Sequence, residues 1–294
     1  MNSTVLIDAA KDGILTGSVY ALMATGLTLI FGVMDIINVA QGILVILGAY
    51  LSYALSVHLG IDLFAGLLIT IPTLFVVGVV VERAFIARLK GPEKTAMSIL
   101  VTYAVALVIE GALSLIFSTN LVQLQASYVN KSFAVGSIHF GFIYVAGFVM
   151  AAVLLSALYF MLYRTRFGVS VRASLADQTS AALVGIDVLR VSTICFGIGV
   201  AITAAGGMIY GATNAFNPNS SYDLISRLLT IIVLGGMGSL SGAMLAGVSM
   251  VFIGDMVGAI WSPVWSTMSY FVVLVLVLLV RPQGLFGKKS ARVA

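Results

Sequence analysis

The chain has 294 residues, of which 61% are hydrophobic and 9% are charged, and its formal net charge is +4. A soluble domain carries roughly a quarter charged residues, so this composition and a mean hydropathy of +1.14 exclude a soluble fold and indicate an integral membrane protein. The length suffices for one helix bundle and leaves no room for a sizeable soluble domain.

Continuous apolar stretches follow one another along the whole chain. About 20 apolar residues span a bilayer as a helix, and these stretches lack the polar alternation of a membrane β-barrel, so we expect helices. The expected spans are approximately 14–34, 42–57, 63–81, 95–118, 141–163, 191–212, 224–236, 242–260 and 264–280. Two of them, 42–57 and 224–236, are short for a crossing, so nine passes and eight full spans with broken or re-entrant segments fit equally well. The predicted fold class is an all-α, polytopic membrane helix bundle of about eight to nine transmembrane helices, in a single transmembrane domain over residues 1–294.

The basic residues indicate which face of this bundle is cytoplasmic. If nine passes begin outside, the residues that fall on one face are Arg83, Arg88, Lys90, Lys94, Arg164, Arg166, Arg172, Arg190, Arg281, Lys288, Lys289 and Arg292. The opposite face keeps Lys11, Lys131 and Arg227. Because Lys and Arg are concentrated on the cytoplasmic side of membrane proteins, we expect the loop 164–190 and the tail 281–294 to be cytoplasmic.

Polar residues interrupt the apolar sequence between Gly32 and Gly42, where Asp35, Asn38 and Gln41 occur. Asn and Gln side chains can satisfy an unwound backbone or face a polar solute, and irregular backbone at membrane depth is tolerated where it lines a cavity or is buried in protein. We therefore predict a helix break in which Asn38, Gln41 and Gly42 face a translocation path or brace the broken helix. The alternative is a plain cytoplasmic turn between two helices.

A second break is predicted in the run GGMGSLSGAMLAG, which begins at Gly235 and holds five glycines in thirteen residues. Each glycine inside a helix costs about 1 kcal/mol relative to alanine, and small residues let membrane helices approach closely. We expect the helix to break between Gly235 and Gly242 and to approach a neighbour there. Gly235, Gly236 and Gly238 are accordingly candidates for the translocation path.

A carboxylate, Glu110, lies well inside the stretch 95–118. A charge at the bilayer centre costs at least about 3 kcal/mol on the insertion scale, so Glu110 needs a partner, a proton or water. It either lines a path, makes a structural hydrogen bond to a neighbouring helix, or lies near the outer interface. Tyr103 occurs seven residues earlier and shares its helix face, and we name both residues as translocation-path candidates.

The segment 164–190, RTRFGVSVRASLADQTSAALVGIDVLR, is polar and charged between two apolar spans. It predicts a short helix on the membrane face, whose small residues pack against a soluble partner while an arginine and an aspartate make polar contacts at the rim. Two glycines would supply the turns at its ends, and an arginine would anchor it at anionic headgroups. The residues assigned to this contact are Arg166, Gly168, Arg172, Ala173, Asp177, Ala181 and Gly185. The alternative is a solvated loop that only obeys the positive-inside rule.

No motif for catalysis, for a cofactor or for a metal occurs in the sequence. His58 and His139 fall in outer loops without a nearby second ligand, and Cys195 lies in an apolar run. The stretch GLFGKKS from Gly284 lacks the first glycine and the final hydroxyl residue of a phosphate-binding loop, and the basic residues lack the aromatic interleaving of a nucleic-acid site. We therefore expect no enzymatic activity, no cofactor, no metal and no nucleic-acid partner.

Several stretches carry a resemblance to a known family. They are GSVYALMATGLTLIFGVMDIINVAQG from Gly17, LGAY from Leu47, the loop TRFGVSVRASLADQTSAALVGIDVLR, LGGMGSLSGAMLAG from Leu234 and RPQGLFG from Arg281. Together they resemble the membrane permeases of branched-chain amino acid ABC importers, specifically the smaller of the two related permeases that form a heterodimer. The resemblance covers nearly the whole chain, and the family also serves ribose, nucleosides and urea. Gln41 stands where many relatives carry histidine, which leaves the substrate more open than the family.

The resemblance implies a path for branched-chain or other small amino acids in a bacterial inner membrane. It implies a second homologous permease subunit, two cytoplasmic ATPase subunits that dock on the loop and the tail, and a periplasmic binding protein that delivers the substrate. Two alternatives remain open. An ion-coupled secondary carrier would place ionisable residues at mid-membrane, where only Glu110 qualifies, and the same ABC family could import urea, amides or another small solute.

Overall fold

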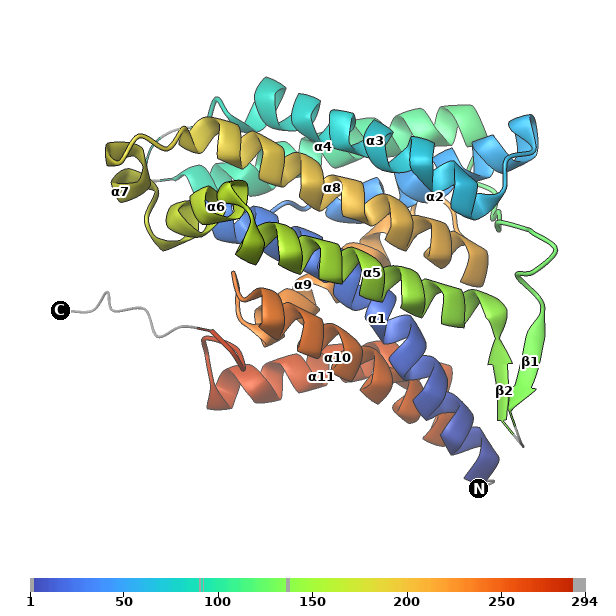
Figure 1. The fold of residues 1–294 in the computed structure, drawn as a ribbon. Coiled ribbons are helices and arrows are strands. Elements are labelled where there is room, and N and C mark those ends of the chain that lie inside the picture. The colour runs from blue at the N-terminus through green and yellow to red at the C-terminus, as the bar shows by residue number, and fades with distance from the viewer. Residues whose placement is uncertain (1–2, 90, 92, 136–137, 288–294) are drawn as a thin grey trace.

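The computed structural model describes residues 3–89, 91, 93–135 and 138–287, and these residues form a bundle of α-helices (Figure 1). Eight described helices are long and apolar enough to cross a membrane. They are α1 (Ser3–Met34), α2 (Gln41–Leu59), α3 (Leu63–Val81), α4 (Lys94–Phe117), α5 (Phe142–Arg164), α8 (Val188–Thr213), α10 (Leu240–Ile260) and α11 (Pro263–Val280). The shorter elements are the π-helical turn η1 (Glu82–Ile86), α6 (Arg166–Ala176), α7 (Gln178–Leu183) and α9 (Ser220–Gly235). The all-α prediction is confirmed, and the arrangement is that of eight full spans with broken segments.

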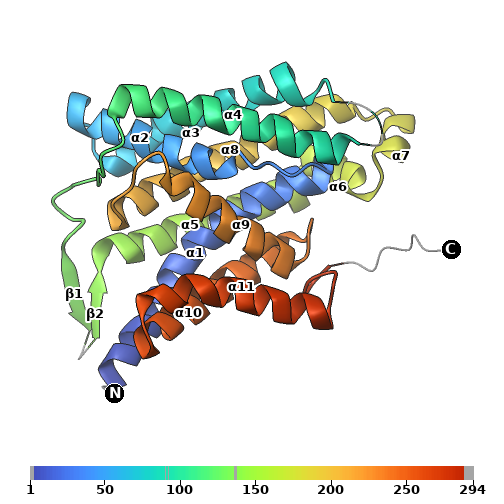
Figure 2. The same cartoon turned by 180° about the vertical axis from the view of Figure 1, so that it is seen from behind.

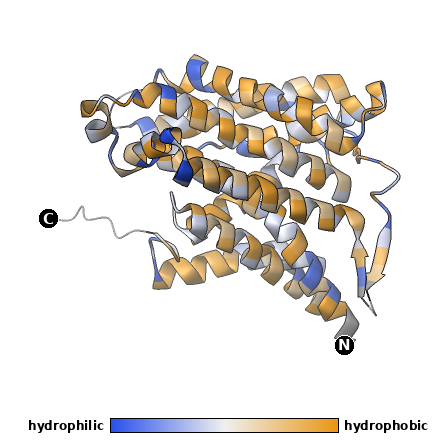
Figure 3. Cartoon of the chain, in the orientation of Figure 1, coloured by the Kyte–Doolittle hydropathy of each residue, from blue (hydrophilic) through white to orange (hydrophobic). Residues whose placement is uncertain are grey.

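Helices α1 and α8 form the centre of the bundle, and they are the most buried of the eight spans. Helices α2, α3 and α5 pack around α8, while α10 packs along α1 and carries α11 on its far side. The view from behind shows α4, α9 and α11 on one side of the bundle (Figure 2). Hydrophobic residues cover the outward faces of the long helices, and hydrophilic residues gather toward the two ends, as expected for a bundle surrounded by lipid (Figure 3).

The central crossing of α1 and α8 depends on two glycines in direct backbone contact. A Cβ added at Gly26 would lie 2.5 Å from the Gly199 carbonyl oxygen, and one added at Gly199 would lie 2.6 Å from the Gly26 carbonyl oxygen. Real Cβ atoms do not approach so closely, so any side chain at either position would force the helices apart. Small residues at helix contacts are the usual means by which membrane helices pack.

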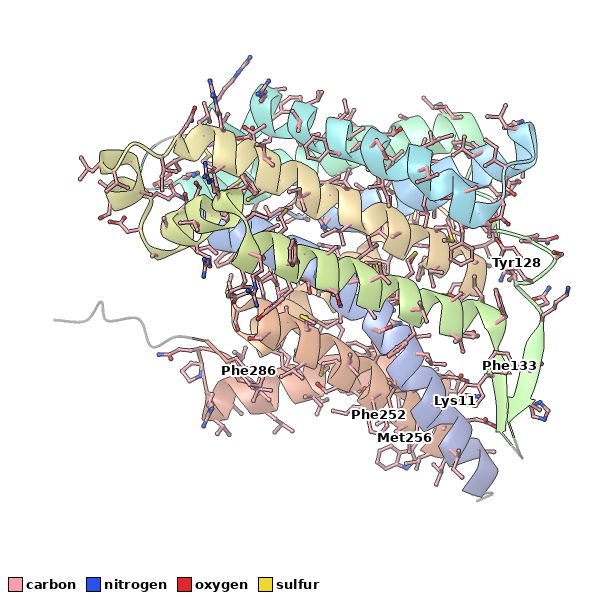
Figure 4. All side chains as sticks on the ribbon, viewed as in Figure 1. Lys11, Tyr128, Phe133, Phe252, Met256 and Phe286 are labelled. Carbon is pink, nitrogen blue, oxygen red and sulfur yellow. The ribbon has the colours of Figure 1, made fainter. Side chains whose placement is uncertain are left out.

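A β-hairpin, which the sequence pattern did not predict, closes the end of the bundle opposite to α6 and α7. Its strands β1 (Ser132–Val135) and β2 (Ile138–Gly141) are antiparallel, with Phe133 opposite Phe140. The Lys11 ammonium donates to the His139 carbonyl and forms an ion pair with Asp8 at 3.0 Å, which ties the start of α1 to the hairpin (Figure 4). Strands of four residues inside a polar loop give too short a pattern to recognise.

Candidate functional site

The break between α1 and α2 is present where the sequence predicted it. Helix α1 ends at Met34, Asp35 adopts a left-handed conformation with φ of 54°, and α2 begins only at Gln41. The Gln41 side-chain amide donates to the Gly199 carbonyl at 3.2 Å. Gly199 lies eleven residues after the start of α8 at Val188, or about 16 Å along its axis at 1.5 Å per residue. Helix α2 therefore begins deep inside the bundle, and the non-helical segment 35–40 leads to it.

Polar side chains on one stripe of α4 form hydrogen bonds with the backbone N–H and C=O groups of this non-helical segment. These side chains recur at helical spacing and face the break. The bonds are Lys94 Nζ to the Met34 carbonyl (3.1 Å), Thr95 Oγ1 to the Asp35 carbonyl (2.9 Å), Ile37 N to Ser98 Oγ (3.3 Å), Val39 N to Thr102 Oγ1 (3.1 Å) and Thr102 Oγ1 to the Ile37 carbonyl (3.3 Å). An irregular backbone inside a membrane bundle needs such partners, because no bulk water is there to supply them. The spacing of 95, 98 and 102 was a signal in the sequence that could have identified this stripe.

Asn38 and Gln41 are both fully buried in the chain. The Asn38 amide donates to Gln41 Oε1 at 2.9 Å, and Gln41 continues the chain of bonds to α8. Asn38 Oδ1 has no hydrogen-bond partner among the described residues. Of the two roles that the sequence left open, this geometry favours bracing of the broken helix.

Gly42 brings the beginning of α2 against the beginning of α9. A Cβ at Gly42 would collide with the Ser221 carbonyl oxygen and would lie 2.9 Å from Cβ of Ile225. Tyr222 directly follows Ser221 in the chain, so this close approach also fixes the position of the Tyr222 backbone. The glycine therefore positions α9 beside the break.

Tyr222 connects α9 to α4 through the carboxylate that the sequence singled out. Its hydroxyl donates to Glu110 Oε2 at 2.7 Å, and the Tyr103 side chain interacts with the same hydroxyl. Tyr103 and Tyr222 are 43% and 45% exposed, and Glu110 is partly exposed. We call these three residues the α4–α9 polar cluster. It lies on the side of the bundle that α4, α9 and α11 form (Figure 2), which we call the open side, and Glu110 is seven residues, or about 10 Å, from the end of α4 at Phe117. No local pattern marks Tyr222 as a partner of Glu110, because 112 residues separate them in the chain.

The second predicted break lies between α9 and α10 and is also present. Helix α9 ends at Gly235, and Gly236 and Gly238 have φ angles of 93° and 83°, which only glycine adopts without strain. Gly235 packs directly on the backbone of Gly242, so the two ends of this break contact each other. The tail returns to this point, because the Leu285 amide donates to the Leu234 carbonyl at 2.8 Å.

The segment 164–190 forms two short helices, α6 and α7, in place of the single helix expected. Asp177 separates them, since its carboxylate accepts from the amides of Thr179 and Ser180 and so caps α7. Gly168 lies inside the first turn of α6, where it packs against carbonyls of α5, so the turn before it is made by Thr165 instead. The expected turn at Gly185 is present, with φ of 86°.

The exposure of this segment differs from the expected pattern of outward alanines. Ala181 is 3% exposed and packs inside the chain, Ala173 is half-buried, and Arg166 and Arg172 are exposed. Within segment 164–190, the most exposed large apolar side chains are Leu183 at 84% and Val184 at 76%, at the C-terminal end of α7. This tip lies outside the predicted contact residues, whose apolar members were small.

A cavity of about 880 Å³ lies at the same end of the bundle, between the ends of α1, α4, α5, α6 and α10. Its wall combines groups of both breaks and of the segment 164–190. The polar residues that line it include Asp35, Lys94, Thr95, Arg172, Gln178, Ser239 and Ser241. The first break, the second break and the two short helices therefore meet at one opening.

Some predicted residues lie elsewhere. Arg227, assigned to the outer face, lies within α9, where it pairs with Asp223 at 2.9 Å and bonds Thr267 of α11 at 3.1 Å. Lys90, Lys288, Lys289 and Arg292 lie outside the described residues. Within the described ranges, no group of three His, Cys, Asp or Glu side chains could hold a metal ion.

A family model and known relatives of similar sequence agree on one family. The family model described as "Branched-chain amino acid transport system / permease component" matches residues 9–280. The chain is 28% identical to the high-affinity branched-chain amino acid transport system permease protein LivH of Escherichia coli (strain K12) and 27% identical to BraD of Pseudomonas aeruginosa, over 94% of each chain. It is 27% identical to a probable LivH of Methanocaldococcus jannaschii, over 98% of this chain and 96% of the relative. Among solved structures, PsaBC from Streptococcus pneumoniae in complex with Fab matches with a TM-score of 0.49 and 12% identity, over 93% of this chain and 92% of that chain.

Proposed function

The chain belongs to the family of branched-chain amino acid transport permease components, and we propose that it is the membrane subunit of an ATP-driven importer for branched-chain or other small amino acids. It is a multi-pass membrane protein and a transport subunit. In the proposed complex it pairs with a second homologous permease, two cytoplasmic ATPase subunits hydrolyse ATP, and a periplasmic binding protein delivers the substrate.

The observation that carries the path proposal is the α4–α9 polar cluster on the open side of the bundle. Glu110 and two tyrosines are exposed or partly exposed there, beside the outward face of α4, whose other exposed side chains are mostly apolar. A carboxylate facing lipid is costly, whereas one facing a water-filled path between subunits is not. We infer that the second permease covers this side and that the path runs between the two, over the break at Gln41 and Gly42.

The ATPase contact is proposed for the segment 164–190. Leu183 and Val184 form an exposed apolar tip, and Arg172 and Asp177 of the same segment line the neighbouring cavity opening. Apolar residues at the centre of a contact with polar residues at its rim are typical of protein interfaces. This end of the bundle is then cytoplasmic, the tail after Arg281 is cytoplasmic as well, and closure of the ATPases would act on the cavity that both breaks line.

Vesicle uptake tests the proposal. We expect proteoliposomes that hold this chain with the second permease and the ATPases to accumulate L-leucine when ATP and a loaded binding protein are supplied on their respective sides. A hydrolysis-deficient ATPase is the matched control and should abolish accumulation. Uptake by this chain alone, driven by a proton or sodium gradient without ATP, would show an ion-coupled carrier. Uptake of urea in place of leucine would keep the family and change the substrate.

A further inference from the structure

We propose that the α4–α9 polar cluster is a subsite for the ammonium group of the transported substrate, with Glu110 as its anion and Tyr103 and Tyr222 as its walls. The inference rests on the proposed function, because it assumes that this side of the bundle faces the path. It goes further by assigning one chemical group of the substrate to three residues.

Glu110 has no cation of its own among the described residues. The ion pairs of the described chain join Lys11 to Asp8 and Asp12, Arg190 to Asp187, and Arg227 to Asp223. Within the described part of the chain, the one hydrogen bond of Glu110 comes from the Tyr222 hydroxyl, which engages Oε2 and leaves the second carboxylate oxygen available. A carboxylate inside a membrane span is normally paired or functional, so a positively charged group is the missing partner.

The surroundings fit a primary ammonium group. An ammonium donates three hydrogen bonds and accepts none, and the cluster offers the second carboxylate oxygen and the phenol oxygens of two exposed tyrosines. Tyrosine faces also attract cations. Leu107 lies on the same stripe of α4, between Tyr103 and Glu110, and is 45% exposed. It supplies an apolar surface for an aliphatic side chain next to the charge.

The backbone around the cluster holds it in place. Gly42 packs on Ser221 beside Tyr222, and Thr102, the neighbour of Tyr103, bonds the backbone of Val39. Both walls of the subsite are thus attached to the break between α1 and α2. A subsite on rigid supports can select one charged group, as preorganised sites do.

The test measures binding and transport in the same complex. The purified permease and ATPase complex in nanodiscs, without the binding protein, is titrated with L-leucine and with its 2-hydroxy acid analogue, which lacks the ammonium. We expect the wild-type complex to prefer leucine by about tenfold, as a charge-assisted hydrogen bond allows. Glu110→Gln should remove that preference, and Glu110→Asp should restore part of it. Val108→Gln adds the same amide on another face of α4, at an exposed residue outside the subsite, and should keep the preference.

Proteoliposome uptake separates this inference from the proposed function. For Glu110→Gln we expect leucine uptake to fall about tenfold while the ATPases still co-purify and the loaded binding protein still stimulates ATP hydrolysis. Equal binding of leucine and the hydroxy acid by the wild-type complex, or normal uptake by Glu110→Gln, overturns the subsite and leaves the importer intact. A parallel loss of co-purification, ATP hydrolysis and uptake also overturns it, because Glu110 would then pair with a cation on the second permease. Absence of ATP-driven uptake in the wild type refutes the proposed function itself.

Discussion

Replacing Thr102 by valine removes one hydroxyl from the polar stripe of α4 and keeps the shape of the side chain. The Val39 amide then loses its acceptor at 3.1 Å, and the Ile37 carbonyl loses a contact at 3.3 Å. Thr102 is fully buried and Val39 is half-buried, so the valine methyl that replaces the hydroxyl leaves this amide without its acceptor on α4. Leaving a buried donor unsatisfied costs about 1–3 kcal/mol, which corresponds to a fall in Tm of about 2–12 °C at 2–4 °C per kcal/mol.

The single cysteine provides the assay. Cys195 is fully buried, so a thiol-reactive dye in detergent reports the temperature at which the bundle opens. Thr28→Val is the matched control, because Thr28 is equally buried but its hydroxyl bonds only the Ala24 carbonyl of its own helix, at 2.9 Å. We expect Thr102→Val to melt well below Thr28→Val. Equal melting temperatures would refute the argument that α4 satisfies the broken segment.

Three further predictions concern packing, the break and the ATPase contact. Gly199→Ala should lower the yield of folded protein, because the added Cβ would meet the Gly26 carbonyl oxygen. The control is Gly111→Ala, whose Cβ would have no neighbour within 4 Å, so it should leave the melting temperature in the dye assay unchanged or slightly raised. Gln41→Leu breaks the bond to α8 at 3.2 Å, so uptake should fall severalfold while the permease pair still assembles; unchanged uptake would contradict the bracing role. Leu183→Ser should release the ATPases in a co-purification experiment without lowering the melting temperature, while Leu121→Ser, also exposed but at the other end of the bundle, should retain them.

The spans and both breaks could be predicted because their signals are local. Apolar runs of helical length mark the long helices, and clusters of glycine with polar residues mark the places where a helix cannot continue. The observed helix boundaries differ from the expected ones where the sequence does not show which residues are buried. Helix α9 begins at Ser220, four residues before the expected stretch, because its first turn is polar and yet packs beside Gly42.

The contacts between distant segments could not be predicted in the same way. The Tyr222 hydroxyl and the Glu110 carboxylate meet only because Gly42 allows α9 to approach the start of α2, which no local pattern records. The direction in which Ala181 points depends on how Asp177 divides the segment 164–190 into two helices. The sequence alone does not show whether an alanine faces a partner protein or the interior of its own chain.

Helix α4 connects the structural and the proposed functional parts of this molecule. Thr102 is fully buried and bonds the broken segment, while its neighbour Tyr103 faces the open side of the bundle. Successive residues of a helix point about 100° apart, so one helix can present a polar stripe to the break and a second polar stripe to the path. Because α4 packs against little besides α2 and η1, the bonds to the break hold it in position. The hydroxyl of Thr102 therefore also determines where Tyr103 and Glu110 lie. Thr102→Val should lower leucine uptake by more than the loss of folding stability of the variant alone would predict.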